Sequence, residues 1–426
     1  MWQVFWIFAI LLALIFTGLP VYIALLLTSI VFMVGMDLPL NLIVIKMFGG
    51  VNSFSLMAIP FFIIAGNIMA KADITDKIID LSDSIVGQFK GGLGHVNILA
   101  SMFFGGIQGS GIADASAIGG MLIPAMEKQG YEKDYAVAVT AGSSMLSPII
   151  PPSIAMILYS YYTEIPVSRL FLGGIIPGAL IALLQMGVNR FMYARRRYDI
   201  PTHAFSMKKL VVSFSRSLGA LMMPIIIIVG IVTGIVTATE AGVIAIAYGL
   251  IYGFLISKKL KLADMPEILL SSGHTTAIVM ITIASAAALS NVLVRMRFQN
   301  EVLSFVVNTI GDPVSGTLFL MVVIFILGMF LDPTVLIAML APTILAVGSA
   351  FSFDPIHYGV VMVILMQVGA ITPPVGSFLF VSCGVANLPI EKAVKPLLPF
   401  IASVMLIILV SFFIPPLVTW LPTILT

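Results

Sequence analysis

The chain has 426 residues, of which 60% are hydrophobic and only 9% are charged. Soluble domains carry about 25% charged residues, so a chain of this composition cannot cover itself with polar surface and is predicted to lie in a membrane. The net charge of +2 gives no indication of nucleic-acid binding, and a single cysteine, Cys383, excludes an internal disulfide.

Apolar runs of about 17 residues or more can cross a bilayer as helices. In chain order, such runs predict membrane spans near 2–17, 20–36, 53–70, 134–163, 170–194, 218–236, 240–257, 272–294, 358–384 and 396–414. Three shorter segments, 39–50, 74–88 and 300–311, are predicted to be interfacial.

Two of these spans, 134–163 and 358–384, are interrupted by proline pairs, Pro151-Pro152 and Pro373-Pro374. Proline removes a backbone donor and clashes with the preceding turn, so a pair of prolines ends a helix. Each span is therefore predicted to be two half-helices joined by unwound backbone.

Two further apolar stretches, 97–125 and 317–347, break at glycine-rich sequences, Gly105–Gly111 and Gly328–Pro333. Each half is too short by this count to cross the membrane alone. We therefore expect two re-entrant helical hairpins, which enter and leave the membrane on the same side.

The second half of the chain repeats the order of the first. Ser147–Ser153 matches Gly369–Val375, and Asp114 before Pro124 matches Asp332 before Pro342. Each copy makes five predicted crossings, and an odd number places the second copy upside down. The predicted fold is an all-α polytopic membrane protein with a first inverted repeat over 1–194, a basic cytoplasmic linker over 195–217 and a second inverted repeat over 218–426.

Basic residues orient this topology, because cytoplasmic loops are rich in Lys and Arg. Most of the 21 Lys and Arg residues fall in cytoplasmic loops if both termini are periplasmic. The basic stretch Arg190–Arg216 has two interpretations: it anchors the topology near anionic headgroups, or it docks a soluble partner.

Asp114 and Asp332 are predicted to lie at equivalent hairpin tips. Carboxylates inside a membrane are costly and therefore informative. One interpretation is that each caps the N-terminus of the second hairpin helix; the other is that each organises a cation site. The two are compatible.

Hairpin tips and broken spans together present carbonyl and hydroxyl oxygens, which sodium prefers and which unwound segments of such folds supply. Helix N-termini nearby suit an anionic substrate. The alternative is that small residues serve close helix packing. The candidate sodium and substrate residues are Gly109, Ser110, Gly111, Asp114, Ser143, Ser144, Ser147 and Ser153 in the first repeat, and Gly328, Leu331, Asp332, Thr334, Gly369, Thr372 and Gly376 in the second.

The sequence contains no phosphate-binding glycine loop followed by Lys and Ser or Thr, so ATP is not the expected energy source. No His, Cys and carboxylate cluster has metal-site spacing, so neither an enzyme nor a cofactor is expected, and sodium is the only metal ion predicted.

At these motifs the chain resembles the large membrane subunit of tripartite ATP-independent periplasmic (TRAP) transporters. The resemblance covers essentially the whole chain. Its most specific parts are Phe104–Gly119, Ile123–Met126, Ser147–Ser153 and Gly369–Gly376.

The resemblance implies sodium-driven import of a carboxylate-containing solute, of the sialic acid or C4-dicarboxylate class, across the bacterial inner membrane. It implies two partners, a periplasmic substrate-binding protein and a small subunit of four membrane helices. It also implies an elevator mechanism, in which the hairpins and broken spans move and the remaining spans form the scaffold. The alternative is a stand-alone sodium/dicarboxylate symporter that needs no binding protein.

Overall fold

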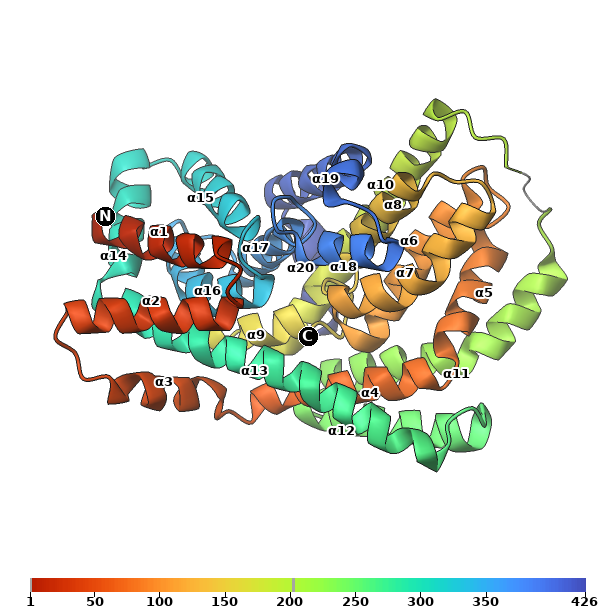
Figure 1. The fold of residues 1–426 in the computed structure, drawn as a ribbon, viewed down its shortest axis with the longest axis horizontal. Coiled ribbons are helices and arrows are strands. Elements are labelled where there is room, and N and C mark those ends of the chain that lie inside the picture. The colour runs from red at the N-terminus through yellow and green to blue at the C-terminus, as the bar shows by residue number, and fades with distance from the viewer. Residues whose placement is uncertain (1, 201–203) are drawn as a thin grey trace.

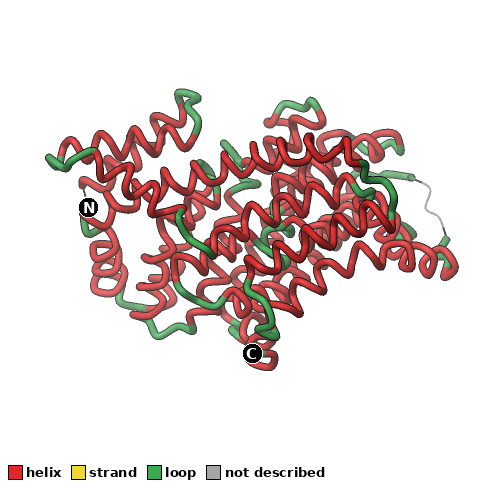
Figure 2. Tube along the Cα trace, turned by 90° about the horizontal axis from the view of Figure 1, so that it is seen from below, coloured by secondary structure: helices red, strands yellow, loops and turns green. Residues whose placement is uncertain are grey.

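The computed structural model describes residues 2–200 and 204–426, so residue 1 and part of the predicted linker lie outside the described residues. The described chain is built from helices and connecting loops and contains no strand (Figure 2). The prediction of an all-helical protein is confirmed over these residues.

The first half contains ten α-helices and one short 3-10 helix among the described residues (Figure 1). Their bounds are α1 Trp2–Phe16, α2 Val21–Gly35, α3 Asn41–Val51, η1 Ser55–Met57, α4 Ala58–Lys71, α5 Ile74–Val86, α6 Gly92–Gln108, α7 Gly111–Lys128, α8 Lys133–Ser144, α9 Ile154–Thr163 and α10 Val167–Arg195.

The second half follows the same order, with an additional helix at its end. Its bounds are α11 Met207–Val232, α12 Ala238–Ile251, η2 Tyr252–Ile256, η3 Leu262–Asp264, α13 Met265–Arg295, α14 Phe298–Ser304, η4 Phe305–Ile310, α15 Pro313–Gly328, α16 Pro333–Ala350, α17 Pro355–Gly369, α18 Ser377–Ala386, α19 Ile390–Phe413 and α20 Pro416–Leu425. Of these, η2 and η4 are π-helical.

Six of the described helices are long and apolar enough to cross a membrane. α3 and α4 add a seventh if this pair, bent by 67°, counts as one span. One of the six is α16, which has 18 residues. We expected each half of the two hairpins to be too short to cross a membrane alone, and for α16 this expectation is wrong. The apolar lengths therefore establish a multi-pass membrane protein.

The helices pack as two groups (Figure 1). One group contains α1 to α4 with α11 to α13, and α13 packs against α2, α3 and α4. The other contains α6 to α10 with α15 to α20. The groups are in contact with each other: α13 packs on α16, α4 packs on α6, and α5 packs on both α6 and α11.

Two of the unbroken spans pack against the hairpins and broken spans. The predicted spans 170–194 and 396–414 form α10 and α19, which pack on α8, α17 and each other. Their faces toward these helices bury small and apolar residues such as Gly173 and Leu397, so they belong with the hairpins and broken spans.

The predicted linker is also shorter than expected, because α10 continues to Arg195 and α11 begins at Met207. Ser206 caps α11 by accepting a hydrogen bond from the backbone N–H of Lys209. A Ser at the N-cap fixes a helix start, so the second half of the predicted linker, 207–217, is the first part of a helix.

Candidate functional site

Both proline pairs interrupt a helix, as predicted. α8 ends at Ser144 and α9 begins at Ile154, while α17 ends at Gly369 and α18 begins at Ser377. Pro151-Pro152 and Pro373-Pro374 lie inside these gaps, and both peptide bonds are cis. Each broken span is thus a pair of half-helices with unwound backbone between them.

The hairpin helices touch the breaks backbone to backbone. A Cβ added to Gly369 would lie 2.3 Å from the carbonyl oxygen of Gly328, and a Cβ added to Gly105 would lie 2.5 Å from the Cα of Ser147. At the first tip, a Cβ on Gly109 would lie 2.2 Å from the carbonyl oxygen of Pro152, and Gly109 has a φ of +62°. Glycine is required at such positions because the approach leaves no room for a side chain.

A cavity of about 90 Å³ lies where the two hairpin tips meet the broken spans. It is lined by residues from both halves of the chain. One of them, Val279, lies on α13. The lining residues are Gly109, Ser110, Gly111, Ile112, Pro148, Ile154, Ala155, Val279, Asp332, Pro333, Thr334, Gln367 and Phe378. Five predicted site residues, Gly109, Ser110, Gly111, Asp332 and Thr334, therefore come together here.

The N-termini of two hairpin helices lie at this cavity. Ser110 caps α7 through the N–H of Ala113, and Asp332 caps α16 through the N–H of Thr334 at 3.0 Å. The predicted capping role is confirmed for Asp332. It is wrong for Asp114, which lies inside α7, four residues after the capping serine.

Asp114 is instead completely buried, and neither of its carboxylate oxygens has a hydrogen-bond partner among the described residues. The expected equivalence of Asp114 and Asp332 is therefore also wrong. The residue that corresponds to Asp332 is Ser110, because these two hold the same capping position in their hairpins. A buried carboxylate without a partner is costly, so Asp114 needs a different explanation.

Three serine hydroxyls, those of Ser101, Ser144 and Ser147, lie next to the Asp114 carboxylate. Each also lies within hydrogen-bond distance of another oxygen: the Ser101 hydroxyl 3.0 Å from the Ser143 hydroxyl, the Ser144 hydroxyl 2.7 Å from the Thr140 carbonyl oxygen and the Ser147 hydroxyl 3.4 Å from the Ser101 carbonyl oxygen. A hydroxyl has one proton and two lone pairs, so each of the three can turn a lone pair toward a cation beside Asp114. A buried group of carboxylate and hydroxyl oxygens is suited to a hard cation, which prefers oxygen ligands.

A polar network holds this group in place. The Asn97 amide donates to the Thr140 hydroxyl at 2.7 Å, and the Ser143 hydroxyl donates to the Asn97 amide oxygen at 2.9 Å. All three residues are completely buried. The predicted site residue Ser143 thus contributes to this network.

The other predicted residues have local structural roles. Ser153 caps α9, and its hydroxyl donates to the Pro148 carbonyl at 2.5 Å. The Thr372 hydroxyl donates to the Val368 carbonyl at 2.7 Å. Leu331 is buried, and Gly376 precedes α18 with a φ of +45°. None of these four lines the cavity between the tips.

Sequence reasoning missed Ser101, Asn97 and Gln367. Gln367 lines the cavity and is 2% exposed, and its amide nitrogen makes no hydrogen bond to a described residue. A signal was present for Ser101, which lies one helical turn before Gly105 and therefore on the same helix face. Nothing in the local sequence indicates the partners of Asn97 or the exposure of Gln367 to the cavity.

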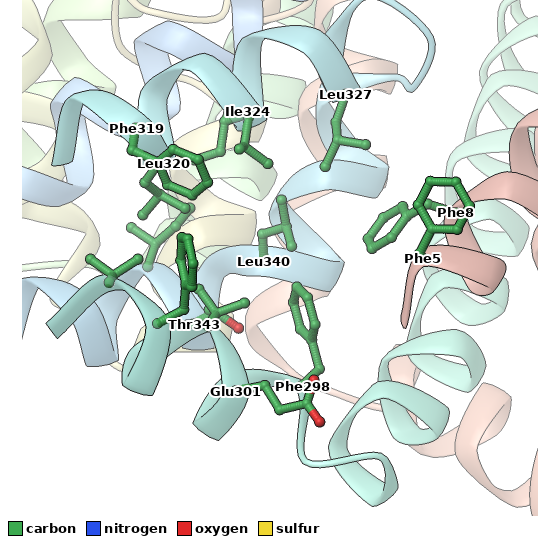
Figure 3. A pocket seen from close by; sticks show the side chains of 15 residues that line it. Phe5, Phe8, Phe298, Glu301, Phe319, Leu320, Ile324, Leu327, Leu340 and Thr343 are labelled. Carbon is green, nitrogen blue, oxygen red and sulfur yellow. The ribbon is translucent and has the colours of Figure 1, made fainter. Parts of the chain in front are cut away.

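A larger cavity, about 400 Å³, lies beside the second hairpin (Figure 3). Its walls come from α1, α14, η4, α15 and α16, and its side chains are almost entirely Phe, Leu, Ile and Val, with Thr343 and Glu301 as the polar exceptions. An apolar cavity of this kind stays dry, so it does not suit a charged solute. Among the described residues, no group of three or more His, Cys, Asp or Glu side chains is placed to hold a metal ion.

Apolar helices of membrane-spanning length, together with two interrupted spans, define a multi-pass membrane protein. The structure is similar to the YdaH transporter of Alcanivorax borkumensis, with a TM-score of 0.58 over 88% of this chain and 89% of that one, at 13% sequence identity. This likeness concerns the fold alone.

The chain belongs to the family of the DctM component of tripartite ATP-independent periplasmic transporters, whose family model matches residues 8–417. It is 35% identical over 412 residues to a putative TRAP transporter large permease protein of Haemophilus influenzae, covering 96% of each chain. It is 31% identical to the sialic acid TRAP transporter large permease protein SiaM of Vibrio cholerae, again over 96% of each. It is 31% identical to the C4-dicarboxylate TRAP transporter large permease protein DctM of Pseudomonas aeruginosa, over 89% of this chain and 88% of that one.

Proposed function

We propose that this chain is the membrane translocation subunit of a sodium-driven secondary transporter in the bacterial inner membrane. It imports a carboxylate-containing solute, of the sialic acid or C4-dicarboxylate class named for its relatives. A periplasmic protein delivers the solute, and a small four-helix membrane subunit packs beside the chain.

The cavity between the tips supports an anionic substrate. The N-termini of α7 and α16 lie at this cavity, and a helix N-terminus carries partial positive charge and free N–H groups. None of the described lining residues is Lys or Arg. The Asp332 carboxylate already compensates the N-terminus of α16, so the N-terminus of α7 and a co-transported cation beyond the one that neutralises Asp114 supply the positive charge that a carboxylate substrate requires.

The substrate enters when the tips separate. A volume of about 90 Å³ is well below the roughly 300–1,000 Å³ of small-molecule sites. Gly111 packs tightly on the Phe378 ring, since a Cβ there would lie 2.4 Å from ring atoms. We infer that the cavity is too small for the substrate in this conformation.

Sodium binds at Asp114. Its two carboxylate oxygens and the hydroxyl oxygens of Ser101, Ser144 and Ser147 form the buried acceptor group that carries this proposal. A bound sodium ion would compensate the carboxylate charge. Moving one charge through 100 mV is worth about 2.3 kcal/mol, which is more than a tenfold concentration ratio at about 1.4 kcal/mol.

Transport follows an elevator mechanism. The two halves of the chain are inverted repeats, and both termini are periplasmic. The group containing α6 to α10 and α15 to α20 moves, and the group containing α1 to α4 and α11 to α13 stays in place. The packing within each group supports the division, and the contacts between the groups, such as α13 on α16 and α4 on α6, must slide during transport. α5, which packs on both groups, is one of the connections that must bend.

The test is uptake in vesicles that contain this chain, its small subunit and a binding protein loaded with labelled sialic acid or succinate. We expect uptake that requires an inward sodium gradient and the binding protein. Equal uptake when potassium replaces sodium would contradict the sodium coupling. Uptake by the chain alone would contradict the partners and favour a stand-alone symporter.

A further inference from the structure

A second polar cavity, of about 390 Å³, lies at the end of α10, far in sequence from the hairpin tips. The side chains that matter are Lys90, Arg190, Arg197, Asp199, Tyr193 and Tyr198. Three basic groups and one acidic group give this cavity a formal charge of +2. It therefore favours an anion.

Buried groups fix the walls of this cavity. Tyr193 is 4% exposed, and its hydroxyl accepts a hydrogen bond from the N–H of Ile200 at 3.1 Å and lies 3.3 Å from the Ile200 carbonyl. The chain after α10 is thereby folded back on the helix. On the other side, the Asn189 amide donates to the carbonyl of Gly91 at 3.1 Å, which holds Lys90 beside α10.

The three basic groups are available to a ligand. Arg196, in the same run of arginines, is neutralised by Glu132 and by Asp134 at 2.8 Å. Lys90, Arg190 and Arg197 form no ion pair with any residue in the described part of the chain. Within the run Arg195-Arg196-Arg197, Arg196 is thus held in ion pairs and Arg197 lines the cavity.

An apolar strip leads from the cavity along α10. Leu183, Gly187, Arg190 and Ala194 follow one face at helical spacing, and all four are exposed. Leu183 is 64% exposed, and a Cβ on Gly187 would meet nothing within 4 Å. The strip is therefore an open, apolar notch that ends at Arg190.

We propose that this cavity binds the headgroup of an anionic phospholipid, with the phosphate between Lys90, Arg190 and Arg197 and an acyl chain over Gly187. Basic pockets at the membrane surface bind anionic headgroups in this way. A free phosphate would satisfy the cavity but would leave the strip unused. The cytoplasmic leaflet follows from the topology proposed above, whereas the binding itself does not depend on it.

The experiment measures lipid retained by the full chain in detergent, by native mass spectrometry, after exchange against phosphatidylglycerol or phosphatidylcholine. We expect preferential retention of phosphatidylglycerol. The double variant Arg190→Gln/Arg197→Gln should reduce that retention by about tenfold or more, since each basic residue contributes about 1 kcal/mol, equal to about fivefold. Arg195→Gln is the matched control, because this exposed arginine lies in the same run but does not line the cavity.

Gly187→Leu separates a lipid from a free anion. Filling the notch should reduce phosphatidylglycerol retention, while the melting-temperature shift produced by inorganic phosphate should not change. Equal losses in Arg195→Gln and the double variant would overturn the proposal, as would full retention in the double variant. A phosphate shift without lipid retention would assign the cavity to a free anion and would also overturn it.

Discussion

The two hairpin and broken-span units share a backbone arrangement but differ in their interiors. Gly105 meets Ser147 in the first unit as Gly328 meets Gly369 in the second. Counting from these glycines, Leu320 and Ile324 of α15 occupy the places that Asn97 and Ser101 occupy in α6. Counting from the capping residues, Leu336 occupies the place of Asp114.

The difference shows that backbone geometry and ion chemistry are separable in this fold. The first unit has a buried polar network around a carboxylate, and the second has an apolar interior with a cavity of about 400 Å³ beside it. Backbone oxygens can be supplied by both units, but a fully buried carboxylate without a hydrogen-bond partner occurs only in the first, because Asp332 of the second unit caps α16. We therefore expect the two units to contribute unequally to cation binding.

The largest expected effect comes from Asp114→Asn. Removing one partner of a buried ion pair costs about 3–5 kcal/mol, so sodium-dependent uptake should fall by about 100-fold or more. Without sodium, the variant should melt at a higher temperature than the wild type. The reason is that the wild type then buries the unpaired charge of Asp114, whereas the variant has a neutral amide at this position. Uptake in vesicles and thermal unfolding check the two parts.

Two carboxylate variants complete this comparison. Asp37→Asn, at an exposed carboxylate in the loop after α2, should leave uptake unchanged. Asp332→Ala should lower the free energy of unfolding by about 1 kcal/mol, the usual value of an N-cap, and Asp332→Ser should restore it. Sodium-dependent uptake retained in Asp114→Asn would show that the two units do not differ as proposed.

The shared geometry is tested by Gly369→Ala and Gly105→Ala. Each new methyl group would meet backbone atoms that cannot rotate away, at 2.3 and 2.5 Å. We expect each variant to lose about 3 kcal/mol of stability, the upper range for overpacking, with a matching fall in melting temperature. Gly120→Ala is the control, since its Cβ would meet nothing within 4 Å. A tolerant Gly105 beside an intolerant Gly369 would show that the contact is not shared.

The contrast between the interiors is tested by exchanging residues between the units. Asn97→Leu removes two hydrogen bonds of the network and should cost about 1–3 kcal/mol. Leu320→Asn places an amide in an apolar wall and should cost a similar amount. Thermal unfolding of both variants gives the result, and a neutral Asn97→Leu would contradict a structural role for the network.

The smallest effect is expected outside the hairpins, in α5. A hydrogen bond with Asp73, together with burial and the negative charges of Asp73 and Asp80, raises the pKa of Asp76 to about 6. The folded state therefore holds this proton more tightly than the unfolded state. The stability contributed by protonated Asp76 is present below about pH 4 and is lost as the pH rises through about 6.

Asp76→Asn should accordingly melt above the wild type at pH 7.5, and the difference should disappear near pH 4. The expected gain is under about 1 kcal/mol, since the side chain is partly exposed. The measurement is the melting temperature of Asp76→Asn and of the wild type between pH 4 and pH 7.5, about the range of the expected titration. Asp37→Asn is the control. A difference that does not change with pH would mean that Asp76 does not titrate in this window.

The sequence predicted the breaks but not the packing. The proline pairs end helices wherever they occur, so both half-helix pairs follow from local chemistry, and the glycine-rich tips follow for the same reason. Asp332 could be recognised as a cap because its own N–H partner is two residues away. The three hydroxyls beside Asp114 belong to α6, to the last residue of α8 and to the break after it, and their position depends on how the helices are rotated about their axes.

The wrong equivalence of Asp114 and Asp332 has a specific cause. An alignment on Pro124 and Pro342 pairs the two aspartates, whereas an alignment on the helix starts pairs Asp332 with Ser110. Similarly, α10 and α19 have the apolar composition of any span, and only tertiary contacts show that they pack with the broken spans. Local sequence patterns thus located the helices, whereas the structure was needed to show which helices pack together.

The two halves interlock instead of lying side by side. α18 of the second half packs on α7 and α8, α9 of the first half packs on α16, and α10 packs on α17, α19 and α20. Neither half therefore encloses its own core. If the chain were cut between α10 and α11, the fragments should assemble when produced together, and each should be degraded when produced without the other.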